Sequence, residues 1–241
     1  MLKIFRKIRQ NMIKKNKTTA YILYAIGEII LVMIGILLAL QVNNWNESRK
    51  QKAELDNILR IISYDMETDT LVAAQILKYY KKHNLNSSRI INKELNQNNY
   101  TDCPECIALV SLYKPMNIQV KGFELLKDLP NQISTQRDSL ITNITQIYTI
   151  FKTNIDKSNQ RLENDAIINM NEFKRFPWFV NWTQGTFNKE MIIYFSESED
   201  YRKRVASHNL LANANHAPLV NEYKRQATEI LKLINERLNT Q

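Results

Sequence analysis

Two cysteines form the clearest chemical motif in this sequence. Cys103 and Cys106 are separated by Pro104 and Glu105, which is the CxxC spacing of redox-active thiol pairs and of half a zinc site. A helix that starts at Pro104 would lower the pKa of the first thiol and permit redox exchange. Zinc would need further ligands, and the sequence has no second CxxC. The sequence favours a structural disulfide, and redox, metal-binding or idle thiols stay open as alternatives.

The three histidines do not suggest a catalytic or metal-binding pattern. His208 falls on an apolar stripe, which predicts a hydrogen-bonded core residue rather than a ligand. His83 and His216 lie in polar or helix-breaking stretches, and neither has a carboxylate at a useful spacing. Only 4 glycines occur in 241 residues, which leaves little material for the phosphate-binding loops of Rossmann or P-loop enzymes. We therefore expect no enzyme activity, no cofactor and no metal.

An aromatic segment at residues 173–187 is a candidate recognition surface. Trp178, Phe179 and Trp182 could contact a ligand, a protein partner or the membrane surface. A lid that covers the open end of a helical bundle is the plainer explanation. The sequence does not decide the secondary structure of residues 173–195.

The elements that must position these residues begin with a long apolar segment. Residues 21–42 contain only two strongly polar side chains, Glu28 and Gln41. At about 1.5 Å per residue they would form about 33 Å of helix, enough to cross a hydrocarbon core of about 30 Å. A cleaved signal peptide would have a shorter apolar region and small residues at its cleavage site. The sequence predicts a transmembrane helix that remains as an anchor.

The charges that flank the span predict its orientation. Residues 1–20 carry seven cations and no acidic residue, whereas residues 43–58 carry three of each sign. The positive-inside rule therefore places the N-terminus in the cytoplasm and residues 43–241 on the periplasmic side of a bacterial inner membrane. The N-terminal cations also account for most of the net charge of +9, and anionic lipid can neutralise them there. This distribution argues against nucleic-acid binding. Residues 1–20 are a topogenic charge cluster or an amphipathic helix on the inner leaflet.

Glu28 is the most informative single residue of the span. It would lie about 5 Å from the middle of the span, where an ionised carboxylate is costly. Gly35 and Ala39 follow on nearly the same helical face, and their small side chains would let another helix approach closely. We expect these three residues to contact a membrane protein or a second copy of the chain, or to form a proton-sensitive element. A protonated glutamate that bonds locally to backbone is the alternative.

The span and its surroundings resemble a known family. The segment YAIGEIILVMIGILLALQVNNWNES at residues 24–48, with FRKIRQ at residues 5–10, is similar to the opening of an uncharacterised family from Bacteroidota, the domain of unknown function 6090. A second block, KPMNIQVKGFELLKD at residues 114–128, resembles the family more loosely, as do DSL at residues 138–140 and IY at residues 147–148. In that block the family pattern Pro-Asn-x-Ser-x-x-Glu-Leu is replaced by PMNIQ. The resemblance implies a small membrane-anchored helical protein and assigns no activity or cofactor.

The remaining residues repeat apolar side chains at helical spacing. A stripe over residues 55–80 predicts a helix that can continue the span. Asp65, Glu67 and Asp69 could form an acidic site there, but a solvated helix flank is favoured. An asparagine-rich stretch at residues 84–104 predicts a turn, a short helix and a loop, before another short helix at residues 103–112.

Two further long helices are predicted in the C-terminal half. The first runs over about residues 138–174, with Thr135 and Asp138 at capping-box spacing, and ends before Pro177. The second begins at a capping box of Ser196 and Glu199, and Pro218 should kink or divide it. Three long amphipathic helices must bury their stripes against one another, and an antiparallel bundle is the economical arrangement.

The expected chain is all-α, with a cytoplasmic segment (residues 1–20), a transmembrane helix (residues 21–42) and an extracytoplasmic helical bundle on a membrane-proximal stalk (residues 43–241). The cytoplasmic segment is too short for a folded output domain. We expect a non-enzymatic envelope interaction module that contacts lipid and either an envelope protein or a second copy. The alternative is a small-molecule or stress-sensing bundle that signals through a membrane partner. A redox enzyme that uses Cys103 and Cys106 lacks a supporting fold.

Overall fold

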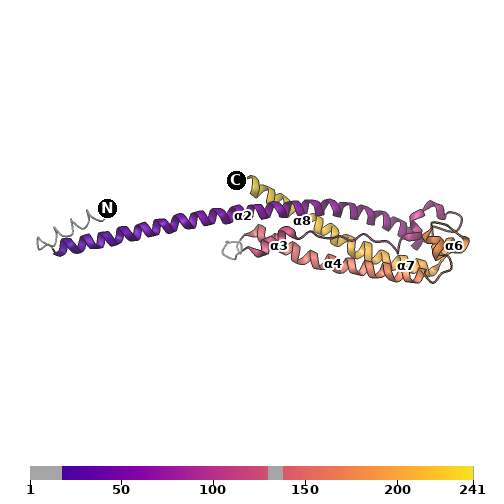
Figure 1. The fold of residues 1–241 in the computed structure, drawn as a ribbon. Helices are drawn as coiled ribbons and strands as arrows, with labels where there is room; N and C mark the ends of the chain where they lie inside the picture. The colour runs from indigo at the N-terminus through magenta and orange to yellow at the C-terminus, as the bar shows by residue number, and fades with distance from the viewer. Residues whose placement is uncertain (1–17, 130–137, 241) are drawn as a thin grey trace. The chain divides into compact units, whose positions relative to one another are not determined.

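The computed structural model describes residues 18–129 and 138–240, and its regular structure there is helical without any strand, as predicted. Residues 1–17, for which an amphipathic helix was one hypothesis, and Thr135 of the predicted cap lie outside the described residues. Figure 1 shows the elements in chain order: α2 (Thr18–Ile91), the 3-10 turns η1 (Tyr100–Asp102) and η2 (Pro104–Ala108), α3 (Lys121–Asp128), α4 (Ser139–Phe173), α5 (Phe179–Thr183), α6 (Lys189–Glu197), α7 (Glu199–Asn209), the π-helical segment η4 (Leu210–His216) and α8 (Ala217–Asn239).

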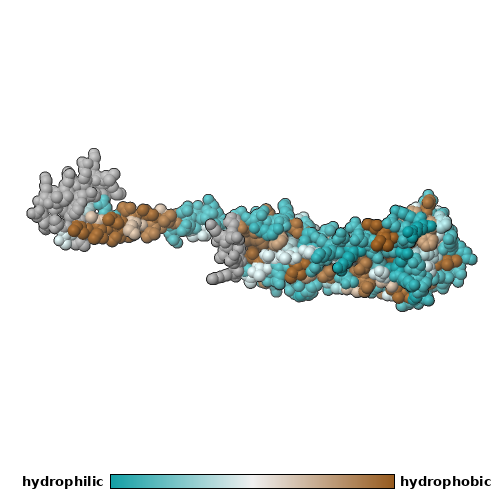
Figure 2. Space-filling model, turned by 90° about the horizontal axis from the view of Figure 1, so that it is seen from below, coloured by the Kyte–Doolittle hydropathy of each residue, from teal (hydrophilic) through white to brown (hydrophobic). Residues whose placement is uncertain are grey.

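The chain divides into two compact units, residues 1–55 and residues 56–241. Of the first unit the structure describes the N-terminal part of α2, and the large apolar side chains with a described exposure between Ile22 and Val42 are 48–71% exposed. Figure 2 shows these hydrophobic side chains gathered along the helix. Among the described residues, α2 is the helix that is long and apolar enough to cross a membrane. The predicted apolar helix is therefore present.

The second unit packs the C-terminal part of α2 against α4, α7 and α8. Asp69 of α2 contacts Tyr223 of α8, whereas His83, farther along α2, contacts His208 of α7. The two segments therefore run in opposite directions. The contacts of α4 with the same C-terminal segments also pair residues in opposite order: Ser158 with His216, Asp165 with His208 and Asn169 with Arg204.

Side-chain caps set the starts of α4 and α7. Asp138 caps α4 by accepting hydrogen bonds from two amides of the first turn. The predicted cap of the C-terminal helix was wrong by two residues, because Ser198 rather than Ser196 accepts the amide of Tyr201. Ser196 instead ends α6 and donates its hydroxyl to the carbonyl of Ile192 at 2.7 Å.

Pro218 divides the C-terminal helix, as predicted. Because proline has no amide N–H, it interrupts the hydrogen-bond ladder of an α-helix. The chain passes from α7 through the wider π-helical segment η4 before α8 begins at Ala217. The side-chain amide of Asn215 donates to the carbonyl of Leu210 at 2.8 Å and satisfies an acceptor within this irregular segment.

Two carboxylates predicted to lie on a solvated flank are buried instead. Asp65 and Asp69 are 3% and 1% exposed, whereas Glu67 between them is exposed. Asp65 accepts the amide of Gly122 at 2.8 Å, in the first turn of α3. The N-cap residue of α3 makes no side-chain capping bond, so Asp65 supplies the cap from another helix.

Gly122 allows α3 to lie directly against α2. A Cβ at this position would lie 2.6 Å from Cγ1 of Ile62 and 2.7 Å from its backbone nitrogen. A backbone atom cannot move aside as a side chain can. Any larger residue at position 122 would therefore require α3 to shift away from α2.

We predict that Gly122→Ala lowers the free energy of unfolding by about 1–3 kcal/mol, because the added methyl group overpacks against the backbone of α2. Urea unfolding of the full chain in detergent, followed by far-UV circular dichroism, measures this change. Gly35→Ala is the matched control, since a Cβ there meets nothing within 4 Å. Equal stability of Gly122→Ala and the wild type would contradict the close helix contact.

Candidate functional site

The CxxC motif forms a disulfide inside the second unit. The Cys103–Cys106 S–S distance is 2.01 Å, and both residues are buried. Pro104 starts the 3-10 turn η2 rather than an α-helix, so the helix-dipole effect expected for a redox thiol has little basis. Thiol exchange requires access to a sulfur atom, and burial opposes it. This environment favours a structural role over a redox one.

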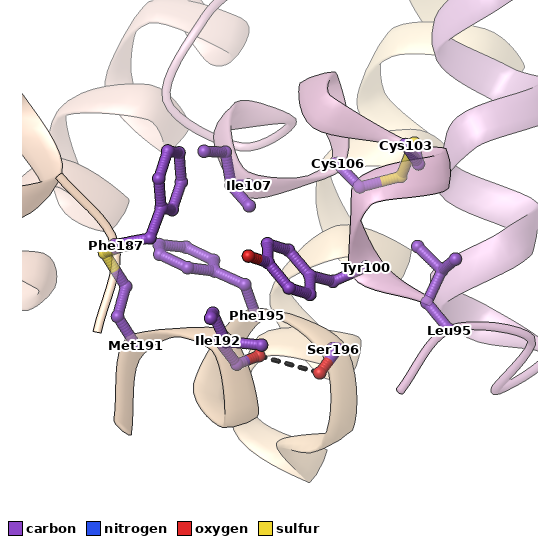
Figure 3. Close-up of a pocket in the computed structure, with 10 residues that line it drawn as sticks. All are labelled: Leu95, Tyr100, Cys103, Cys106, Ile107, Phe187, Met191, Ile192, Phe195 and Ser196. Carbon is purple, nitrogen blue, oxygen red and sulfur yellow. Dashed lines mark hydrogen bonds between the residues drawn. A yellow bond between two sulfur atoms is a disulfide. The ribbon is translucent and has the colours of Figure 1, made fainter. Parts of the chain in front are cut away.

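The disulfide borders a small pocket whose walls are mostly apolar. Figure 3 shows Tyr100 and Phe195 facing each other, with Phe187 and Ile107 beside them and Leu95 below the disulfide. The cavity measures about 10 Å³, which is about the space of one water molecule. The pocket therefore holds no organic ligand in this conformation.

The aromatic segment joins the core beside this pocket. Trp178 is 1% exposed and stacks on Phe176 at a ring-centroid distance of 4.7 Å. Phe179 and Trp182 are only partly buried and pack against the same core. Trp178 is therefore not part of a surface, and its burial favours the lid interpretation. The segment itself contains the short helix α5, which the sequence left undecided.

All three histidines lie in the core of the second unit. His208 is fully buried, and its Nδ1 lies 2.7 Å from Oδ2 of Asp165, which agrees with the predicted hydrogen-bonded core position. His83 and His216, which the sequence placed in polar contexts, are also buried. His83 Nε2 lies 2.9 Å from the carbonyl oxygen of Leu109.

One sequence signal could have revealed the burial of His83. It follows Tyr80 by three residues, so it continues the apolar stripe of the first helix by one more turn. His216 had no comparable signal, because it lies in the π-helical segment, where the ordinary helical spacing does not hold. Its Nδ1 lies 3.0 Å from the hydroxyl of Ser158 on α4.

Burial sets the protonation of three groups in this core. It lowers the pKa values of His83 and His216 from 6.5 to about 4, so both rings are neutral near pH 7. Burial raises the pKa of Asp69 from 3.8 to about 6, although hydrogen bonds from the Tyr223 hydroxyl at 2.6 Å and the Gln119 amide at 3.1 Å oppose that rise. The described residues contain no group of three or more His, Cys, Asp or Glu side chains placed to hold a metal ion.

The predicted intramembrane residues lie together on α2 in the first unit. At 100° per residue, Glu28, Gly35 and Ala39 fall within an arc of about 40°. Glu28 is half-buried, and a Cβ on Gly35 would have open space around it. The open space at Gly35 leaves room for another helix to approach this narrow face.

Comparison with known proteins finds a family match over part of the chain. Residues 28–102 match the model of the family of unknown function DUF6090. The chain is similar to this family over that stretch, which is about a third of its length. This match supports the resemblance of the apolar segment. The matched stretch ends directly before Cys103, so residues 114–128 lie outside it. The curated proteins and the solved structures contain no match.

The buried histidines predict that acid destabilises the second unit. Because the folded pKa values of His83 and His216 are lowered, the unfolded chain binds protons first, and each residue should lose about 2 kcal/mol of stability between pH 7 and pH 5. Asp69 acts in the opposite direction, because its folded form takes up a proton before the unfolded form does. Its protonation should raise the free energy of unfolding by about 1 kcal/mol between pH 7 and pH 5.

Urea midpoints of the full chain in detergent at pH 7 and pH 5 measure this balance. We expect the wild type to lose stability at pH 5, the double variant His83→Gln/His216→Gln to gain slightly, and Asp69→Asn to lose more than the wild type. A double variant with the acid loss of the wild type would contradict the assignment.

Proposed function

We propose that this chain is a single-pass membrane protein whose helical unit binds a protein partner of the cell envelope outside the cytoplasm. The observation that carries the proposal is the exposure of the aliphatic side chains between Ile22 and Val42. Exposed apolar surface costs about 25 cal/mol per Å² in water, and a lipid bilayer removes that cost. A helix satisfies its own backbone hydrogen bonds, so it can enter lipid without further partners.

Charge and redox chemistry support the orientation. The seven cations of residues 1–20 favour a cytoplasmic N-terminus under the positive-inside rule. The second unit would then lie in the periplasm of a bacterial cell, and a Cys103–Cys106 disulfide persists in such an oxidising compartment. The proposed architecture is thus an antiparallel helical bundle that an inner-membrane helix holds in the periplasm.

The span itself would contribute contacts within the bilayer. Gly35 and Ala39 let a second helix approach closely, and a carboxyl group such as that of Glu28 is stable in hydrocarbon when it faces protein rather than lipid. The proposed partner of this face is another membrane helix, from an envelope protein or a second copy.

A reporter at the C-terminus tests the orientation. We expect alkaline phosphatase fused after Gln241 to be active, because this enzyme folds correctly only outside the cytoplasm. We expect green fluorescent protein at the same position to be dark, because it does not fold when it is exported in an unfolded state. Neutral replacements of the seven N-terminal cations should weaken this asymmetry. A fluorescent C-terminal fusion, or release of the full chain from membranes by carbonate, would contradict the proposal.

Photocrosslinking within the span tests the contact face. A photoreactive residue at Val32, about 40° from Glu28 around the helix, should capture a partner in intact cells, whereas one at Leu37 on the opposite face should not. Gly35→Leu should reduce capture from Val32 several-fold, since it blocks close approach, and Gly27→Leu is the matched control on a neighbouring face. Equal capture from both positions, or none, would argue against a specific face.

A further inference from the structure

An open groove lies between α4 and the η4–α8 segment, and its floor includes Ser158, the residue that bonds to His216. Its volume is about 580 Å³, within the size range of small-molecule sites. Phe151 and Ser158 of α4 form its buried floor, and Pro218 and Leu219 of α8 line the other wall. Part of that wall is the π-helical segment, an irregularity that often accompanies functional sites.

The two ends of this groove differ in chemistry. Ring contact between Phe151 and Tyr223 places the start of the α4 wall opposite α8, and the Ser158–His216 hydrogen bond places its later part opposite η4. The groove therefore has an apolar end and a polar end. The end beside Tyr223 is lined by the apolar residues Ile150, Phe151, Pro218 and Leu219 together with Glu222, and the polar end by Lys157, Arg161 and Asn215.

The polar end carries positive charge that the described chain does not balance. Lys157 and Arg161 lie one helical turn apart on the exposed face of α4, so both can reach one bound group. Neither has a carboxylate within 4 Å among the residues that the structure describes, whereas Lys152 on the same helix pairs with Asp156. Glu222, an acidic lining residue, is held by Arg225 at 2.5 Å.

We propose that the groove binds a free single-chain amphiphile with an anionic head group, a carboxylate or a phosphate. Lys157 and Arg161 bind the head by charge-assisted hydrogen bonds, and the side-chain amide of Asn215 lies beside it. The alkyl chain lies on Ile150 and Leu219, where it removes apolar surface from water. This site goes beyond the proposed envelope contact and does not depend on which side of the membrane the unit occupies.

Octyl phosphate and a photoreactive octanoate with a diazirine in its chain are the probes. The full chain is reconstituted in phosphatidylcholine nanodiscs, labelled with the photoreactive octanoate and mapped by mass spectrometry. We expect label on the apolar end of the groove and competition by octyl phosphate. Inorganic phosphate and octanol should compete at least tenfold more weakly, because each supplies only half of the recognised chemistry.

Two pairs of variants separate the ends of the groove. Lys157→Gln/Arg161→Gln should weaken octyl phosphate roughly tenfold, while Lys189→Gln/Lys232→Gln, with the same loss of charge elsewhere, should not. Ile150→Ser should weaken octyl phosphate several-fold, while Ile168→Ser, which is exposed about 27 Å farther along α4 and does not line the groove, should not.

Four results in phosphatidylcholine nanodiscs would overturn the proposal. They are label outside the groove, wild-type affinity of Lys157→Gln/Arg161→Gln, competition by inorganic phosphate equal to that of octyl phosphate, and competition by octanol equal to it. A fifth measurement repeats the competition in nanodiscs that contain anionic lipid. If octyl phosphate competes in phosphatidylcholine nanodiscs but not in these, the occupant is a bilayer lipid rather than a free amphiphile, and the proposal is overturned.

Discussion

Two buried carboxylates on adjacent turns of α2 determine how the second unit is assembled. A carboxylate that leaves water needs replacement hydrogen bonds, and each one here finds them on other elements. Asp65 accepts the Gly122 amide at the start of α3, and Asp69 accepts the Gln119 amide and the Tyr223 hydroxyl of α8. The cost of burial is offset only when all three elements are in place together. A shift of any one of them would strand a carboxylate in the core, so these contacts specify one register where apolar stripes alone would permit several.

The sequence predicted the helices well because helical spacing is a local signal. The apolar stripes identified α4 and the C-terminal helix, and the missing amide of Pro218 located the break within one turn. The burial of Asp65 and Asp69 could not be predicted in this way. Their partners lie 50 to 154 residues away in the chain, and no local pattern tells which backbone amides will be brought to a carboxylate.

The same limit applies to the candidate sites: the sequence shows which residue types gather in a segment, but not which way each side chain points in the fold. Aromatic density marked residues 173–187 as a candidate recognition surface or a lid, but the direction of each ring depends on the short helix α5 and its neighbours. Trp178 therefore lies in the core while Val180, two residues later, is 61% exposed. Likewise, the CxxC spacing alone left the chemistry open, and the burial of both cysteines among apolar neighbours is what favours a structural disulfide.

The second unit has a core pocket that is already filled and a groove between α4 and α8 that is open. The groove is the one of these two that has space for another molecule. The pocket beside the disulfide has room for about one water, so a guest there would have to displace aromatic side chains that already pack against one another. At the α4–α8 seam no such displacement is needed, because the groove is already hollow and its Lys157 and Arg161 side chains are exposed. Under the proposal, a ligand in the groove would leave the core contacts intact, so the lining residues could change without loss of the fold.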